Sequence, residues 1–199
     1  MKRVLVALVV VLGVVAASPA FAADYYIMPV AAKSCSPQTV RIGEPVTCHI
    51  TLTNSTESNI AFYETYIRDR YSGSPTLVSS TLTRPDGTTT NDVCYDSTEA
   101  PVNQPHFRCD ALGSLQVGQT ESVDITFVYD TPGTYTDTAE TWVWVIQGGG
   151  TVSVYDDSQS TASDTITVLG APASKADCRH GGYADFGFAS QKECMRFLK

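Results

Sequence analysis

Alternating apolar and polar residues dominate the middle of the chain. From Val46 to Thr53 every second residue is apolar, and the positions between them hold Thr and His. The segment from Val123 to Tyr129 repeats this alternation, and a longer one runs from 134 to about 146. A period of two residues is typical of a strand with one buried face. The pattern therefore predicts three strands here.

Shorter segments of the same character fill the spaces between these strands. Turn residues separate them, as in Gly43-Glu44-Pro45 and Arg84-Pro85-Asp86-Gly87, and helical periodicity appears only near the C-terminus. Many short strands at this spacing indicate an all-β, antiparallel β-sandwich. The shorter predicted strands are 25–30, 39–42, 60–67, 77–82, 93–95, 107–109, 151–155 and 164–169.

The first 22 residues have the pattern of a secretory signal peptide. Lys2 and Arg3 precede an apolar run over 4–17, and Ala20-Phe21-Ala22 supplies a small-x-small cleavage pattern. The apolar run is shorter than the roughly 20 residues of a membrane-spanning helix. We therefore expect a soluble protein that is secreted to the extracellular space or associated with the cell surface, with no membrane insertion.

Six cysteines in an exported chain predict a disulfide framework. Pairing between sequence neighbours closes loops of roughly 15 residues, each contributing about 3 kcal/mol on the chain-entropy model. Six cysteines allow 15 connectivities, so other pairings stay open. No two of them form the CxxC spacing of zinc sites. The favoured pairs are Cys35 with Cys48, Cys94 with Cys109, and Cys178 with Cys194.

The C-terminal segment differs from the rest of the chain. Residues 174–199 hold two cysteines, several Gly and aromatic residues, and two helix-start patterns, at Ser174 and at Ser190. Gly181-Gly182 is expected to end the first helix. We predict a signal peptide (1–22), a β-sandwich domain (23–170) and a C-terminal disulfide microdomain (171–199), a small helical hairpin.

The mature surface is predicted to be acidic. The whole chain has 13 Lys and Arg against 21 Asp and Glu, a net charge of −8. Without Lys2 and Arg3 the count is 11 against 21, or −10. Nucleic acid and anionic membranes are poor partners for such a field, so we expect an extracellular protein or polysaccharide partner and no nucleic acid.

Several features together resemble a known repeat domain of surface proteins. They are Gly43, Thr53-Asn54, a Cys-flanked hairpin, the turn from Leu112 to Gly118, and Thr138-Ala139. Over about residues 39–145 the chain resembles the conserved-repeat domain of bacterial and archaeal surface proteins known as domain of unknown function eleven. It departs from that family in having a single copy and Asp137 in place of Asn. The resemblance implies an immunoglobulin-like surface module without catalytic residues.

The tail carries a second resemblance. Asp177-Cys178-Arg179, the Gly181-Gly182-Tyr183 step, Phe186-Gly187-Phe188 and the closing Gln191-Lys192-Glu193-Cys194 are similar to a short C-terminal motif of secreted actinobacterial proteins. That motif usually has Trp in place of Tyr183. The resemblance supports bacterial export and implies no particular activity.

Catalytic patterns are missing from the sequence. It contains no Gly-x-Ser-x-Gly, no His-Glu-x-x-His and no Gly-rich phosphate loop. The three histidines, His49, His106 and His180, lie in distant segments, so no zinc centre is expected. We predict a non-enzyme without cofactors. Calcium is the one metal hypothesis, with Asp156 and Asp157 as loop ligands together with Asp130 or Asp92.

Lys33 is the only lysine between the signal peptide and the tail. An exposed lysine is the ordinary interpretation of such a residue. The alternative is an intramolecular isopeptide bond to a buried carboxyl, with Asp137 or Asp164 as the partner.

Trp142 and Trp144 lie two residues apart on one predicted strand, so both face the same way. They fall on the outer face, opposite the row that is predicted to enter the core. Two hypotheses account for this position: a stacking platform for sugar rings, helped by Tyr63, Tyr66 or Tyr71, or a hydrophobic face that the tail covers. The corresponding functions are a structural or adhesive surface module and a carbohydrate-binding module.

Overall fold

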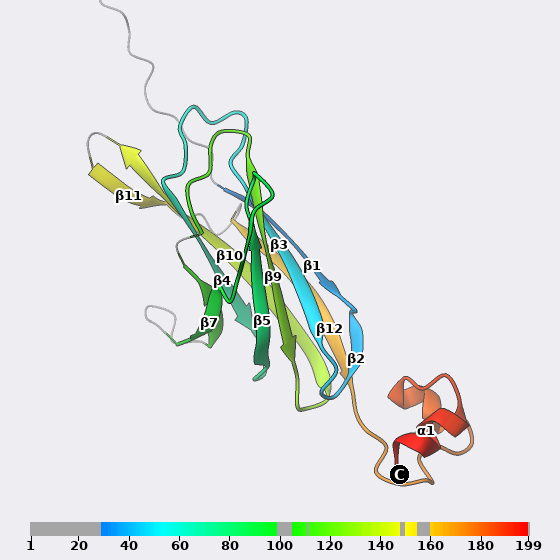
Figure 1. Cartoon of the computed structure of the whole chain (residues 1–199). Helices are drawn as coiled ribbons and strands as arrows, with labels where there is room; N and C mark the ends of the chain where they lie inside the picture. The colour runs from blue at the N-terminus through cyan, green and yellow to red at the C-terminus, as the bar shows by residue number, and fades with distance from the viewer. Residues whose placement is uncertain (1–28, 99–104, 111, 148–149, 155–159, 199) are drawn as a thin grey trace, which may run out of the picture.

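The computed structural model describes residues 29–98, 105–110, 112–147, 150–154 and 160–198 (Figure 1). These residues form two packed β-sheets and a small C-terminal unit at one end of them. The predicted signal peptide, 1–22, lies outside the described residues. None of the described helices is both long and apolar enough to cross a membrane.

The first sheet has five strands, and the second has seven. The order in the first sheet is β1 (Val30–Ser36), β3 (Val46–Thr53), β9 (Thr120–Val128), β5 (Thr76–Thr83) and β6 (Thr89–Asn91). The order in the second is β2 (Thr39–Arg41), β12 (Thr161–Leu169), β10 (Gly133–Gln147), β4 (Glu64–Tyr71), β8 (His106–Cys109) and β7 (Cys94–Ser97), with β11 (Gly150–Val154) on the free end of β10. All pairs are antiparallel except β2 with β12. The predicted antiparallel β-sandwich is confirmed.

The predicted strands differ from the observed ones mainly at the start of the chain and at β4. The prediction missed β1 and β6, and the strand predicted at 25–30 falls almost wholly outside the described residues. The strand predicted at 60–67 begins four residues later. Phe62 instead makes an isolated bridge to Leu115, and both side chains are fully buried. Phe62 is apolar because it is buried outside β4, and from sequence alone this apolar residue looks like part of the strand.

The core lies between the two sheets and follows the predicted alternation. In β3 the residues at 46, 48, 50 and 52 are buried, and their neighbours in sequence are more exposed. Phe107, Phe127 and Tyr129 form a chain of ring contacts through the core, with successive centroids 5.6 Å apart. Full burial of such a side chain contributes about 1.5–3 kcal/mol. This packing holds the sheets face to face.

The structure links the cysteines in three pairs of sequence neighbours, which are the favoured ones. Cys35–Cys48 joins directly opposite residues of β1 and β3, and Cys94–Cys109 joins opposite residues of β7 and β8. The third bond, between residues 178 and 194, lies within the tail. The first two bonds fasten a strand at the edge of each sheet to its inner neighbour.

The tail contains a short 3₁₀ helix, η1 (Gly182–Phe186), and one α-helix, α1 (Gln191–Phe197). Ser190 caps α1 as predicted, because its Oγ accepts a hydrogen bond from the Glu193 amide at 3.2 Å. The helix predicted to start at Ser174 is replaced by a series of turns, and η1 begins where that helix was expected to end. Cys178, Phe188 and Cys194 form the buried centre of this unit.

Candidate functional site

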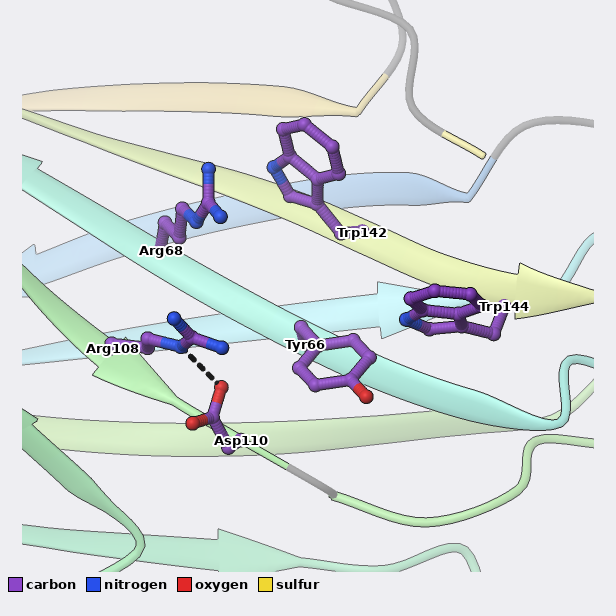
Figure 2. Close-up of a pocket in the computed structure, with 6 residues that line it drawn as sticks. All are labelled: Tyr66, Arg68, Arg108, Asp110, Trp142 and Trp144. Atoms are coloured by element: carbon purple, nitrogen blue, oxygen red, sulfur yellow. Dashed lines mark hydrogen bonds and ion pairs between the residues drawn. The ribbon is translucent and has the colours of Figure 1, made fainter. Parts of the chain in front are cut away.

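A hollow of about 270 Å³ opens on the outer face of the second sheet, over β10, β4 and β8. Figure 2 shows that three aromatic rings line one side of it and two guanidinium groups line the other. The aromatic residues are Tyr66, Trp142 and Trp144, and the polar ones are Arg68, Arg108 and Asp110. Both tryptophans of the chain therefore share one concave surface.

Strand register explains why these side chains meet. Trp142 lies directly opposite Tyr66 in the β10–β4 ladder, and Arg68 lies opposite Arg108 in the β4–β8 ladder. Residues two apart on a strand point to the same face. Tyr66 and Arg68 on β4 therefore share the outer face with the two tryptophans of β10. Residues of three adjacent strands thus converge on one surface.

The arginines make the hollow locally basic on an acidic protein. The Arg68 guanidinium carbon lies 4.6 Å from the centroid of the Trp142 ring, a cation–π distance. Arg68 Nη1 is buried and makes no hydrogen bond to any residue within the described ranges. Arg108 Nε donates to Asp110, and that hydrogen bond raises the pKa of Arg108. Arg68 therefore brings its positive charge to the hollow beside the Trp142 ring, while its Nη1 atom is shielded from solvent.

Tyr66 is held in a fixed position as a neutral ring. Its hydroxyl donates to Glu64 Oε2 at 2.6 Å. Burial, followed by that hydrogen bond, raises the pKa of Tyr66 to about 12. The ring therefore stays protonated at neutral pH and presents a rigid apolar face, which suits stacking better than a mobile side chain.

The hypothesis that the tail covers the tryptophans is wrong. The tail packs against the end of β12 and β2: Arg41 Nε donates to the Phe186 carbonyl at 3.0 Å, and Arg41 lies over the Phe188 ring at 4.1 Å. Gly187, at φ 71°, approaches Leu169 so closely that a Cβ there would lie 2.6 Å from its side chain. The tail therefore contacts the end of the sandwich that is opposite to β11 (Figure 1).

Strand geometry gives the scale of this separation. Gly133 of β10 pairs with Val168 near the tail, whereas Trp144 pairs with Ser153 of β11. At about 3.3 Å per residue, Gly133 and Trp142 are about 30 Å apart along the strand. The two tryptophans remain half-buried and line an open hollow. Most apolar residues of the tail pack on one another instead, and Phe197 stays exposed.

Of the three tyrosines proposed as helpers, only Tyr66 joins the tryptophans. Tyr63 is 57% exposed and lines a separate hollow with Ile146. The Tyr71 ring packs on Phe107, with centroids 4.6 Å apart, at the other end of β4. Tyr63 therefore offers an exposed aromatic side chain outside the hollow, which is useful as a control.

The predicted calcium ligands do not form a described cluster. Asp156 and Asp157 lie outside the described residues, and Asp130 is exposed in the turn after β9. In the ranges that the structure covers, Cys35, Cys48 and Asp137 are the one group of three potential ligands close enough to share an ion. Two of these sulfur atoms are joined to each other in a disulfide, so they cannot act as thiolate ligands.

The histidines and Lys33 occupy unrelated places. His49 lies on the outer face of the first sheet, where its Nδ1 is 2.7 Å from Asp124. His106 begins β8, where its side chain is buried. Lys33 was interpreted first as an exposed lysine, but its side chain is fully buried against Asp69 and Asp137. These groups lie apart from the aromatic hollow.

The sequence interpretation missed Arg68, Arg108, Asp110 and Asp69 as site residues. The signal for the β4 residues was weak, because in Thr65-Tyr66-Ile67-Arg68-Asp69 two apolar residues are followed by two charged ones and the alternation is broken. Ending the predicted strand at 67 excluded Arg68 and Asp69 from it. Asp110 and Arg108 could be placed only by knowing that β8 pairs with β4.

No protein-family model matches the chain, and no curated protein matches it in sequence. Solved structures do match. The major pilin SpaD from Corynebacterium diphtheriae aligns with 70% of this chain and 34% of its own at 9% identity and TM-score 0.50. A cohesin module of a family 33 glycoside hydrolase from Clostridium perfringens aligns with 72% of this chain and 99% of its own, at 12% identity and TM-score 0.47. A CARDB domain from Pyrococcus furiosus aligns with 72% of this chain and 94% of its own, at 12% identity and TM-score 0.41.

These likenesses concern the fold. The likeness to the pilin, together with the sheet order, identifies an immunoglobulin-like antiparallel β-sandwich, as predicted. The disulfides found among the described residues indicate folding in an oxidising compartment. The predicted membership of the repeat family stays a prediction.

Proposed function

We propose that the protein is a non-catalytic extracellular adhesive module that binds carbohydrate through the aromatic hollow of its second sheet. The observation that carries this proposal is the convergence of Trp142, Trp144 and Tyr66 on one concave surface beside two arginines. Large aromatic residues on an outer sheet face mark a binding surface when no segment of the chain packs over them.

The chemistry of the hollow suits a sugar. Aromatic rings offer flat apolar faces to the C–H face of a pyranose, and arginine N–H groups donate to hydroxyl or carboxylate oxygens. A few fixed polar groups in a mainly apolar cavity are typical of small-ligand sites. Arg108 is paired with Asp110, so the lining residues carry one net positive charge, and a sugar that carries a carboxylate fits better than a neutral one.

The lining residues support a binding role over a catalytic one. Asp110 is the single carboxylate among the residues that line the hollow. It accepts hydrogen bonds from Arg108 and from the Tyr95 hydroxyl, so it is engaged as a structural acceptor. Glycoside hydrolysis generally needs two carboxyl groups that flank the bond.

The test is titration with oligosaccharides while tryptophan emission is recorded. Because the chain has two tryptophans and both line the hollow, emission reports this site directly. A uronic-acid oligosaccharide and a neutral glucan of equal length serve as probes. Saturable emission changes that Trp142→Ala removes and Tyr63→Ala retains support the proposal. No change with either probe, or equal loss in both variants, contradicts it.

A second candidate, a purely structural surface module, is favoured by a different observation. Disulfides join edge strands to inner strands in both sheets, and a buried charge cluster joins the sheets to each other. Such bracing suits a domain that must withstand proteolysis or mechanical load. A protein that binds neither probe and resists protease at temperatures where its disulfide-free variant is cut would favour this role.

A further inference from the structure

Three fully buried charged side chains connect the two sheets. Lys33 lies on β1 of the first sheet, and Asp69 and Asp137 lie on β4 and β10 of the second. Lys33 Nζ donates to Asp69 Oδ1 and lies 2.9 Å from Asp137 Oδ1. All three side chains have no exposed surface. Strand register explains why the two carboxyl groups lie close together. Asp69 of β4 pairs with Ala139 of β10, and Asp137 of β10 pairs with Tyr71 of β4, so the two aspartates are diagonal neighbours in the β4–β10 ladder.

One member of this cluster, Asp137, is held in its protonated form. Burial, and next the charge of Asp69, raise the pKa of Asp137 to about 8, so Asp137 is protonated at neutral pH. Lys33 and Asp69 then form a pair without net charge. Transfer of one proton from Lys33 Nζ to the Asp69 carboxylate that it contacts gives the amine and the carboxylic acid that condense.

The strands hold the reacting atoms together without solvent. The Cys35–Cys48 disulfide fixes β1 to β3 two residues from Lys33. Phe107 and Phe127, both fully buried, belong to the same core. Holding two groups in contact raises their effective concentration by many orders of magnitude, and exclusion of water disfavours the reverse hydrolysis. An amine and a carboxyl group in this setting can condense without any added reagent.

We propose that Lys33 and Asp69 become joined by an intramolecular isopeptide bond, with Asp137 as the acid that assists the reaction. The neutral Lys33 Nζ attacks Asp69 Cγ, and Asp137 donates a proton to the Asp69 oxygen. The C–O bond then breaks, one water leaves, and the proton lost from nitrogen returns to Asp137. The N–Cγ amide bond is formed, no group is oxidised or reduced, and Asp137 is regenerated.

Asp164, predicted as an alternative partner, has another role. Its Oδ2 accepts from the Cys35 amide at 2.7 Å, and its Oδ1 accepts from Gln38 Nε2 at 2.9 Å. It therefore fixes the backbone of β1 near Lys33 without joining the cluster. This makes Asp164→Asn a matched control: it removes a nearby carboxylate and leaves the three reacting groups in place.

The decisive measurement is the intact mass of the exported, wild-type protein after reduction and denaturation. We expect a mass lower than that of the processed sequence by one water, with Lys33 resistant to trypsin and fragment spectra that join the Lys33 and Asp69 peptides. The full sequence mass overturns the proposal. A water loss that maps to a succinimide at Asp86-Gly87, or a bond from Lys33 to Asp137, overturns it as well.

Variants test the role of each group and need only the same mass readout. Asp69→Ala and Lys33→Met should keep the full mass, and Asp164→Asn should lose one water as the wild type does. Asp69→Asn should lose one ammonia in place of one water, because the amide nitrogen becomes the leaving group. Asp137→Asn should form the bond at least tenfold more slowly in a time course after refolding. A wild-type rate in that variant contradicts the assisting role of Asp137.

Discussion

The β4–β10 ladder has charged side chains on its inner face and large aromatic side chains on its outer face, the reverse of the usual arrangement in a sheet. Its inner face holds Asp69 and Asp137 around the lysine of β1, and its outer face holds Tyr66, Trp142 and Trp144. Charged groups thus lie in the core, whereas large aromatic rings line an open hollow. Buried charge is costly, and exposed aromatic surface is uncommon without a partner. Both faces therefore point to chemistry beyond folding.

The same alternation produces both faces. Along β4, residues 65, 67 and 69 point inward while 66, 68 and 70 point outward, and β10 follows the same rule. A shift of one residue in register would exchange the two sets. The pairing of Trp142 with Tyr66 therefore fixes the aromatic hollow and the buried cluster together.

The largest effect is expected at the inner face, from Lys33→Met. This change removes the cation and leaves two carboxyl groups buried, which costs about 3–5 kcal/mol for a broken buried ion pair. If the isopeptide bond forms, the amide replaces the Lys33–Asp69 ion pair, and the variant loses a cross-link that closes a loop of 36 residues, worth about 4 kcal/mol on the chain-entropy model. Urea unfolding measures the loss of stability.

A triple variant separates the charge effect from the cross-link. Lys33→Met with Asp69→Leu and Asp137→Leu replaces the whole cluster by apolar groups, a change that often restores or exceeds the stability lost with a buried pair. A triple variant as stable as the wild type would mean that no cross-link contributes. We expect it to recover part of the loss and remain below the wild type.

The sandwich could be predicted from sequence because one face of each main strand is uniformly apolar. In β3 and β9 the alternation is regular, and the predicted and observed strands nearly coincide. The cluster partner Asp69 could not be predicted in the same way, since a charged residue at an inward position breaks the apolar pattern. The apolar Phe62 moved the predicted strand towards the N-terminus, and Asp69 fell outside it. Contacts between the two sheets depend on how the sheets pack, and this packing cannot be predicted from the pattern of a single sequence.

At the outer face, Trp142→Ala is expected to weaken oligosaccharide binding by roughly ten- to hundredfold, or about 1.4–2.8 kcal/mol. The ring is half-buried and stacks with Arg68, so its removal also releases that guanidinium. Fold stability should change far less than with Lys33→Met. Calorimetric titration of the variant beside Tyr63→Ala measures the difference. If the Trp142→Ala and Tyr63→Ala variants bound the oligosaccharide with equal affinity, the hollow would not be the binding site.

The pH dependence of stability should report mainly Asp137, although burial also raises the pKa of Glu121 on the first sheet. Asp137 has an ordinary pKa of 3.8 when unfolded and a pKa of about 8 when folded. Between these values the unfolded chain has released the proton that the folded chain retains, so the free energy of unfolding falls as pH rises from about 4 to about 8. Urea midpoints across this range should decrease, and Asp137→Asn should flatten the profile. A profile that rises over the same window in the wild type alone would contradict the raised pKa.

The smallest effect is expected from deleting residues 171–199. The tail contacts the sandwich through Arg41 and the end of β12, about 30 Å along β10 from Trp142. Loss of the Arg41 contacts should cost about 0.5–2 kcal/mol, and the tryptophan emission maximum should stay unchanged. A red shift on deletion would show that the tail shields the outer face in solution. Because the hollow is lined wholly by β4, β8, β10 and Asp110, unchanged emission and unchanged oligosaccharide affinity would show that the sandwich presents this face without the tail.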